Sequence, residues 1–225
     1  NEVVRRVAAI KMLANEAEAG IRIGGIVDRD FLSGADATAL DRDQGVHVLP
    51  VHEIENFFLH PQTLTSLLQQ NGRAELQAAD LVCNAADARA GSWIFQHAMA
   101  TRNAKALPAI APAAKERAKG YTWAQIDADR NAAIAGVLAA SGFGTPEQAT
   151  LRGILETSVN IYARKRGEAG LWKECEGKQV LNGVARAAGF ADALALTQAA
   201  YTLWANNAAA ISPELAAFRT YLTGL

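Results

Sequence analysis

Apolar residues recur along the chain in distinct patterns, and each pattern predicts a kind of element. At the N-terminus they fall at helical spacing and predict an amphipathic helix that ends near Gly20; these residues are Val3, Val7, Ile10 and Leu13. Residues 21–27 form a short β-branched run, and residues 46–50 form another that Pro50 stops. Such runs are typical of buried parallel strands. The polar, acidic stretch 32–44 between them is expected to be a loop.

From residue 61 onward the spacing of apolar residues is helical. Pro61 is a favourable first residue for a helix, and the pair Asn71-Gly72 is expected to end it. Further helices are expected over residues 73–83, 86–107, 121–140, 145 onward, 197–205 and 213–222. We therefore predict an α/β protein with three parts: an α/β core (1–60), a helical insertion (61–160) and a C-terminal helical part that completes the site (161–225).

Composition narrows the class of protein. Of the 225 residues 50% are hydrophobic and 20% are charged, so the chain can bury a full core. The formal net charge is −1, so a nucleic-acid-binding surface would have to be a local patch. No apolar run reaches the ~20 residues of a membrane span. Cys83 and Cys175 lie in no metal-type spacing and are expected to be reduced thiols of a cytoplasmic protein. Because the chain opens on Asn1 inside a helical pattern, it is expected to be a fragment of a longer protein.

Two carboxylates follow the first predicted strand. Asp28 and Asp30 are spaced i and i+2, and side chains at that spacing on an extended chain point the same way. Ligands of open α/β sheets bind beyond the carboxyl ends of the strands. Mg²⁺ typically takes one or two carboxylates and keeps several waters. The pair is therefore a candidate metal site, and the alternative is a solvated turn in which Asp30 caps the next segment.

A second acidic pair follows the second predicted strand. Glu53 and Glu55 precede Asn56 and an apolar run. Glu55, alone or with Glu53, could be a further metal ligand or could orient one. The alternative is a helix start with acidic residues in its first turn. The histidines of this stretch have no Cys partners and no HxxxH spacing, and we interpret them as core or surface residues: His47, His52 and His60.

Positive charge is densest at Arg164, Lys165 and Arg166. This cluster could contact the phosphates of a nucleic acid, or it could be a solvated helix end. Further on, Gly177 and Lys178 open a predicted helix. A lysine beside a helix N-terminus can stabilise charge on a phosphoryl oxygen. The alternative is an exposed lysine after a loop glycine.

Three blocks taken together carry a resemblance to a known family: GIVDRDF at 25–31, EIENFF at 53–58 and WKECEGKQVL at 172–181. They resemble the Toprim domain of overcoming-lysogenisation-defect (OLD) type nucleases and of related ATPase-associated Toprim proteins in bacterial anti-phage defence. The resemblance covers essentially the whole chain, and the helical insertion matches in character.

The resemblance implies a Toprim-like, partly parallel sheet with a large α-helical insertion and C-terminal helices. It implies a metal-dependent endonuclease for DNA or RNA in which Asp28 and Asp30 hold Mg²⁺ or Mn²⁺. Glu55 would assist as a further metal ligand, and Lys178 would support phosphodiester chemistry. It also implies an oligomeric assembly with an ATPase domain or subunit of the ABC or AAA type, and no membrane. The chain holds no GxxxxGK[ST] loop, so that ATPase is expected outside it.

One departure from the family and two alternative functions bear on this interpretation. A Toprim site also needs a glutamate at the end of a first strand, before the first helix. The only candidate here is Glu2, which lies inside the predicted helix, so either the family glutamate is expected upstream of this chain or the domain is degenerate. A haloacid-dehalogenase-like phosphatase also has a DxD after an apolar strand, but it requires Thr or Val after the second Asp, where this chain has Phe31. A non-enzyme alternative is a catalytically silent Toprim-like module that docks an ATPase or senses a phage component.

Overall fold

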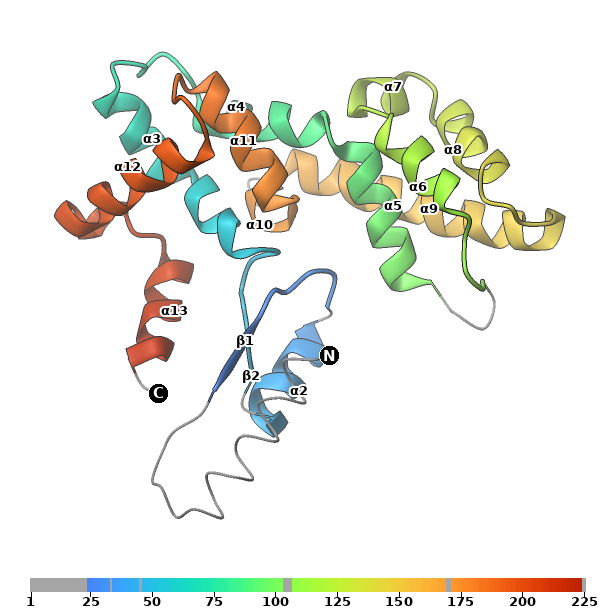
Figure 1. Cartoon of the computed structure of the whole chain (residues 1–225), viewed down its shortest axis with the longest axis horizontal. Coiled ribbons are helices and arrows are strands. Elements are labelled where there is room, and N and C mark those ends of the chain that lie inside the picture. Colours follow the sequence, from blue (N-terminus) through green and yellow to red (C-terminus); the bar gives the residue numbers. More distant parts are fainter. Residues whose placement is uncertain (1–23, 33, 45, 103–106, 169–170, 224–225) are drawn as a thin grey trace.

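The strands and helices were assigned in a computed structural model, which describes residues 24–32, 34–44, 46–102, 107–168 and 171–223. The protein is mostly helical and contains a small parallel sheet. In Figure 1 most helices form a broad layer, and the strands lie below it with helix α2. The amphipathic helix predicted before Gly20 lies outside the described residues.

The sheet consists of β1 (Gly25–Val27) and β2 (Val46–Val48), which pair in parallel with Val27 opposite Val48. The prediction that these two stretches are neighbours in one sheet is confirmed, although both strands are shorter than expected. Val46 is fully buried, as a parallel strand covered by other elements requires.

The segment between the strands is a helix, α2 (Gly34–Gln44), so the prediction of a loop over 32–44 was wrong. Parallel strands need a crossover connection, which is usually a helix. The sequence GADATALDRDQ is rich in alanine, which favours helix, and Asp36 lies in the positive first turn. The helix was not predicted because it has too few large apolar residues to show a helical pattern.

Most helices after β2 follow the predicted pattern with shifted bounds, but the helix over residues 112–119 was not predicted. The 3₁₀ helix η1 (Ile54–Leu59) leads into α3 (Pro61–Gln70), which has the predicted bounds. The following helices are α4 (Ala78–Asp87), α5 (Ala90–Thr101), α6 (Pro112–Lys119), α7 (Trp123–Ala128), α8 (Arg130–Ala139) and α9 (Thr145–Gly167). The expected helix over 121–140 is two helices, because the Asp129 side chain accepts a hydrogen bond from the Ala132 amide and caps α8.

The last part of the chain consists of short helices that pack on the rest. They are α10 (Leu171–Glu174), α11 (Gly177–Ala187), α12 (Ala193–Asn206), the 3₁₀ helix η2 (Ala208–Ala210) and α13 (Pro213–Thr223). Helix α13 reaches the sheet, where the Tyr221 hydroxyl donates to the Gly25 carbonyl oxygen at 3.4 Å. Phe218 on the same helix stacks on Phe57 of η1 with ring centroids 5.7 Å apart.

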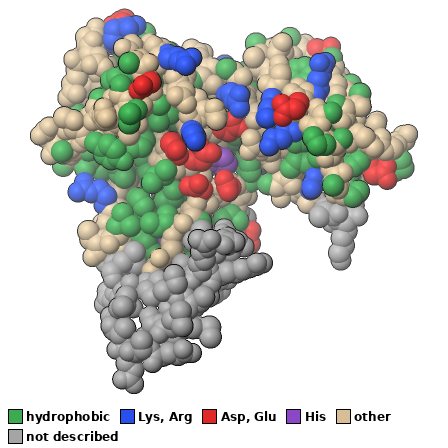
Figure 2. Space-filling view, in the orientation of Figure 1, with side chains coloured by type: hydrophobic (Ala, Val, Ile, Leu, Met, Phe, Trp, Pro, Cys, Tyr) green, Lys and Arg blue, Asp and Glu red, His purple; other side chains and the backbone are tan. Residues whose placement is uncertain are grey.

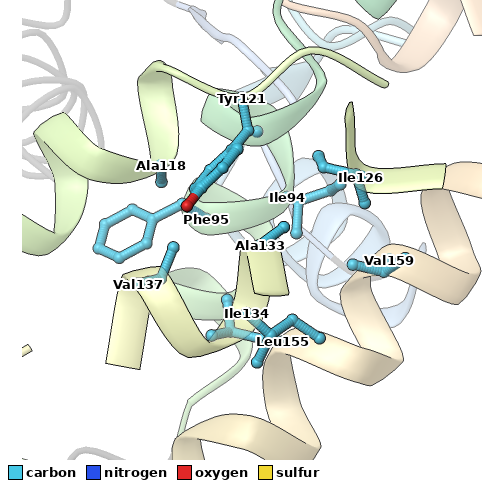
Figure 3. Close-up of a pocket in the computed structure, with 11 residues that line it drawn as sticks. Ile94, Phe95, Ala118, Tyr121, Ile126, Ala133, Ile134, Val137, Leu155 and Val159 are labelled. Atoms are coloured by element: carbon cyan, nitrogen blue, oxygen red, sulfur yellow. The ribbon is translucent and has the colours of Figure 1, made fainter. Parts of the chain in front are cut away.

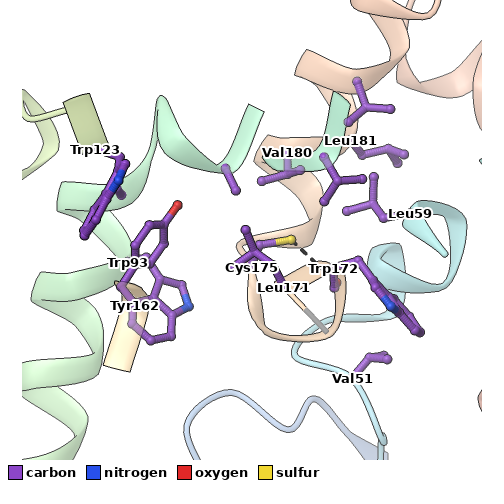
Figure 4. Close-up of a cluster of buried hydrophobic side chains, with 14 of the residues drawn as sticks. Val51, Leu59, Trp93, Trp123, Tyr162, Leu171, Trp172, Cys175, Val180 and Leu181 are labelled. Atoms are coloured by element: carbon purple, nitrogen blue, oxygen red, sulfur yellow. Dashed lines mark hydrogen bonds between the residues drawn. The ribbon is translucent and has the colours of Figure 1, made fainter. Parts of the chain in front are cut away.

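One hydrophobic core joins the helices of the insertion to the C-terminal helices. Figure 4 shows Trp93, Trp123 and Tyr162 packed together near Cys175, which lies beside Leu171 and Val180. Helix α9 runs without a break through residue 160, where a domain boundary was expected. This helix therefore spans the expected boundary between the insertion and the C-terminal part, and the three-part division of the chain stays a prediction.

Helices α5, α6, α8 and α9 enclose the apolar side chains shown in Figure 3 so closely that a cavity of only ≈ 20 Å³ is left.

None of the helices in the described part of the chain combines the length and apolarity needed to cross a membrane.

The contact of α5 with the turn after α6 depends on Gly91. Its amide donates to the Tyr121 carbonyl oxygen at 3.0 Å. A Cβ at Gly91 would lie 2.7 Å from that oxygen and still closer to the Ala118 carbonyl oxygen.

We expect Gly91→Ala to lower the free energy of unfolding by about 1–3 kcal/mol, because two backbone segments must move apart. Gly153→Ala on α9 is the matched control, because a Cβ there meets nothing within 4 Å. It should be neutral or stabilise the protein by about 0.5–1 kcal/mol. Urea denaturation followed by circular dichroism measures both, and equal stability of the two variants would contradict this packing.

Candidate functional site

The loop after β1 is held in place through its backbone, and its carboxylates are exposed. Asp28 and Asp30 are both exposed. The Asp30 amide donates to the His52 carbonyl oxygen at 3.2 Å, and Nδ1 of His52 donates to the Asp30 carbonyl oxygen at 2.8 Å. These bonds hold Asp30 at a φ of 44°, a left-handed conformation that Asp adopts more readily than most residues. His52, which was predicted to be a core or surface residue, is buried and holds this loop through these hydrogen bonds.

Phe31 fixes the same loop against the helical layer. Its ring lies 4.8 Å from His52, 5.6 Å from Trp93 and 5.4 Å from His97, measured between ring centroids. Trp93 and His97 both belong to α5. The position of the two aspartates is therefore set by the helices as well as by the sheet.

Asn56 joins the segment after β2 to the turn before α11. It is fully buried. Its side-chain oxygen accepts from the Glu53 amide at 2.8 Å, and its Nδ2 donates to the carbonyl oxygens of Trp172 at 2.5 Å and Cys175 at 3.1 Å. A Cβ at Gly177 would lie 2.9 Å from Cγ of Asn56, so only glycine leaves room for this contact.

The start of α11 meets the acidic segment directly. The amide of Lys178 donates to Oε2 of Glu53 at 2.8 Å across a sequence separation of 125 residues. A carboxylate is favourable in the first turn of a helix, where free amides carry partial positive charge. The fold thus brings residue 178 to the segment that holds Glu53 and Glu55. The Lys178 side chain is exposed, and its catalytic assignment stays a prediction.

Four carboxylates interact electrostatically at this place: Asp28, Asp30, Glu53 and Glu55. Partial burial raises the pKa of Asp28 above its ordinary value, and the charges of Asp30 and Glu55 raise it further. Partial burial also raises the pKa of Glu53, against the effect of the hydrogen bond from the Lys178 amide. In the described part of the chain, none of these carboxylates forms an ion pair with Lys or Arg. Figure 2 shows acidic side chains gathered at the centre of one face.

A cleft of ≈ 640 Å³ opens beside the first two carboxylates. Its lining comes from the β1–α2 loop and helix α2 on one side and from α5 and α6 on the other: Asp28, Asp30, Phe31, Leu32, Asp36, Phe95, Gln96, Met99, Ala100 and Lys115. This volume lies within the range of ligand pockets in proteins. Helix α5 and Lys115 were missed by sequence reasoning, because nothing in the sequence pairs them with Asp28.

The donor set suits a hard cation bound mainly through water. Among the described residues, no three His, Cys, Asp or Glu side chains converge closely enough to hold a metal ion by themselves. Mg²⁺ needs only one or two carboxylates, and repulsion between Asp28, Asp30 and Glu55 is relieved when a cation binds. The chemistry of Asp28 and Asp30 is thus compatible with Mg²⁺ or Mn²⁺, and the assignment of Glu55 as a further ligand stays a prediction. Glu2 lies outside the described residues.

The predicted phosphate-binding cluster is partly neutralised within the protein. Lys165 pairs with Glu174 at 3.0 Å, and Nε of Arg166 lies 2.9 Å from Oδ2 of Asp87. Arg164 is exposed. Lys165 and Arg166 would have to exchange these partners for a phosphate, so the role of the cluster in nucleic-acid binding stays a prediction.

Comparison with known proteins adds no relative to this description: no family model, no curated protein and no solved structure matches the chain. The resemblance of the three sequence blocks to Toprim domains is therefore still an expectation. What the structure adds is their arrangement, because the blocks around Asp28, Glu55 and Lys178 meet in one region.

We expect Asn56→Ala to lower the free energy of unfolding by about 2–4 kcal/mol, because it leaves buried backbone groups of Glu53, Trp172 and Cys175 without this partner. Asn182→Ala is the matched control, since Asn182 is exposed on α11 and bonds only within its own helix among the described residues. The control should change stability by less than about 0.5 kcal/mol. Similar urea midpoints for the two variants would show that the Asn56 bonds do not hold the segments together.

The raised pKa of Asp28 predicts how stability depends on pH when no divalent metal is present. A carboxyl whose pKa is higher in the folded state favours folding when protonated, and this contribution is lost as the pH rises through the folded-state pKa. With EDTA at about pH 7, Asp28→Asn should therefore be more stable than the wild type, by less than about 1 kcal/mol because solvent screens the exposed carboxylate.

The gain should disappear as the pH falls below about 4, near the ordinary pKa of an aspartate. Thermal denaturation across this range measures the effect. Asp127→Asn on α7, an exposed position, serves as the control. A gain for Asp28→Asn that persists unchanged at acidic pH would refute the electrostatic origin.

Proposed function

We propose that the chain is the Toprim-type, metal-dependent nuclease domain of a bacterial anti-phage defence protein. It would hydrolyse phosphodiester bonds of DNA or RNA in the cytoplasm, in an oligomeric assembly with an ATPase domain or subunit. The observation that carries the proposal is electrostatic: the charges of Asp30 and Glu55 both act on Asp28, and these carboxylates follow the two strands of one parallel pair.

The contacts around these residues support a role in phosphodiester chemistry. Asp28 and Asp30 follow β1, and the segment of Glu55 follows β2, so the carboxylates lie beyond the same edge of the sheet. The N-terminus of α11 lies against Glu53 in the same segment. The carboxylates offer ligands for a metal, and the exposed ammonium of Lys178 at the start of α11 offers positive charge for a phosphate oxygen.

In this proposal the residues of the chain have separate tasks. Asp28, Asp30 and Glu55 would hold Mg²⁺ or Mn²⁺, which when bound activates water and stabilises the leaving oxygen. His52 and Phe31 position the aspartates through the bonds and ring contacts described above. Asn56 positions Glu53 and Glu55 relative to α11. The ammonium of Lys178 would oppose the charge that develops on the phosphoryl group in the transition state.

A catalytically silent binding module is the second candidate. One observation favours it: in the described ranges, no group of three potential metal ligands is already assembled. Such a module would keep the folded arrangement around Asn56 and would bind an ATPase or a phage component without cutting nucleic acid. The two candidates differ in what removal of the carboxylates does to activity.

We expect Asp28→Asn and Asp30→Asn each to reduce cleavage by on the order of 10²–10³-fold, because each removes charge from the metal site while leaving the fold in place. The assay uses the full-length protein with its ATPase, plasmid DNA and single-stranded RNA as substrates, and Mg²⁺ or Mn²⁺. Asp127→Asn should cleave like the wild type.

Absence of cleavage by the wild type under all these conditions would reject the nuclease and leave the silent module. Unfolding of the two aspartate variants, seen by circular dichroism, would instead mark Asp28 and Asp30 as structural caps.

A further inference from the structure

The cleft beside Asp28 and Asp30 has a second wall, formed by helices α5 and α6, which carries one positive charge. Opposite Asp28 and Asp30, helix α5 contributes Gln96, Met99 and Ala100, and helix α6 contributes Lys115. Of the described residues that line the cleft, Lys115 alone carries a positive charge. A negatively charged ligand that enters beside the carboxylates would therefore meet a cation on the far wall.

The position of Lys115 follows from how α6 packs. Ala114 and Ala118 on α6 are buried in the helical core, whereas Lys115 is exposed at the cleft. No ion pair joins Lys115 to another residue within the described ranges, although its charge helps to lower the pKa of the exposed carboxyl of Glu116. Lys119, one turn further along, differs in this respect: its ammonium lies 2.7 Å from Oε1 of Glu116.

The other polar residue of this wall cannot replace Lys115 as a donor. Nε2 of Gln96 donates to Oε1 of Glu176 at 2.6 Å and to the Ser92 hydroxyl at 3.2 Å, which uses both of its N–H groups. Glu176 is buried and also accepts from Ser92, so this network fixes Gln96 in place. Among the described cleft-lining residues of α5 and α6, Lys115 is the one left to bind an anionic oxygen.

We propose that Lys115 binds a phosphate of the substrate strand next to the one that is cleaved, and that the α5–α6 wall is the substrate-binding surface of the nuclease. This inference rests on the proposed function and adds the residue that receives the strand. The apolar lining offers a surface for the sugar or base and includes the aromatic residues Phe31 and Phe95 beside Leu32 and Met99.

The charge distribution favours this wall over the cluster at residues 164–166. Lys165 and Arg166 already pair with Glu174 and Asp87. Binding a phosphate at either of these two side chains would cost its ion pair, whereas no ion pair joins Lys115 to another described residue. A lysine bound to a non-reacting phosphate acts equally in the ground state and the transition state, so its loss should weaken binding rather than slow the chemical step.

The test measures binding of a fluorescein-labelled single-stranded DNA oligonucleotide to the full-length protein by fluorescence anisotropy. Ca²⁺ replaces Mg²⁺ so that the strand stays intact, and the salt concentration is varied. Lys115→Ala should weaken binding about fivefold. It should also reduce the slope of log affinity against log salt by about 0.7, the value expected for one lost phosphate contact on a single strand.

Two variants control for loss of structure and for non-specific charge. Lys115→Arg keeps the charge and should bind like the wild type. Lys119→Ala removes the same residue type from the same helix outside the cleft and should change neither the affinity nor the salt slope. With Mg²⁺ restored, Lys115→Ala should raise KM and leave kcat nearly unchanged.

Each remaining outcome overturns the inference in a distinguishable way. If the wild type cleaves nucleic acid and Lys115→Ala matches it in affinity and salt slope, Lys115 does not bind the strand and the proposed function stands. If Lys119→Ala weakens binding as much as Lys115→Ala, the effect is one of net charge and not of the cleft. If the wild type neither binds nor cleaves nucleic acid, the proposed function and this inference fail together.

Discussion

The arrangement of the candidate site depends on the buried side chain of Asn56. Its amide bonds at one end to the Glu53 backbone and at the other to the carbonyl oxygens of Trp172 and Cys175. A buried amide with satisfied hydrogen bonds is specific in both direction and distance, which apolar packing alone is not. Gly177 allows this close approach, and the amide of Lys178 in the helix that begins there then donates to Glu53. Two segments more than 100 residues apart are thereby fixed against each other.

The carboxylates near Asn56 lower the stability of the metal-free protein when they are all charged. Asp28, Asp30 and Glu55 repel one another, and partial burial of Asp28 adds to that cost. The protein compensates with backbone contacts: His52 holds the Asp30 loop, and the rings around Phe31 tie it to α5. In the proposed metal site, a bound cation would relieve this repulsion.

Sequence reasoning recovered the parts that depend on local patterns. The strands were recognised because apolar, β-branched runs are typical of buried parallel strands, and α3 because Pro61 and Asn71-Gly72 mark its ends. It missed α2, whose residues are too polar to show a helical stripe. It grouped Asn56 with the acidic block but could not assign its role, because the partners are backbone carbonyls that the sequence does not identify. It overlooked Lys115 for a related reason, since only the packing of α6 brings it to the cleft of Asp28.

The most direct test of the account is calorimetric titration of the full-length protein with Mn²⁺. The account predicts heat of binding for the wild type and for Asp127→Asn, and loss of that heat for Asp28→Asn and Asp30→Asn, with all four proteins folded. Equal binding by the wild type and the two site variants, or no binding by any of them, would contradict a metal site built on these carboxylates.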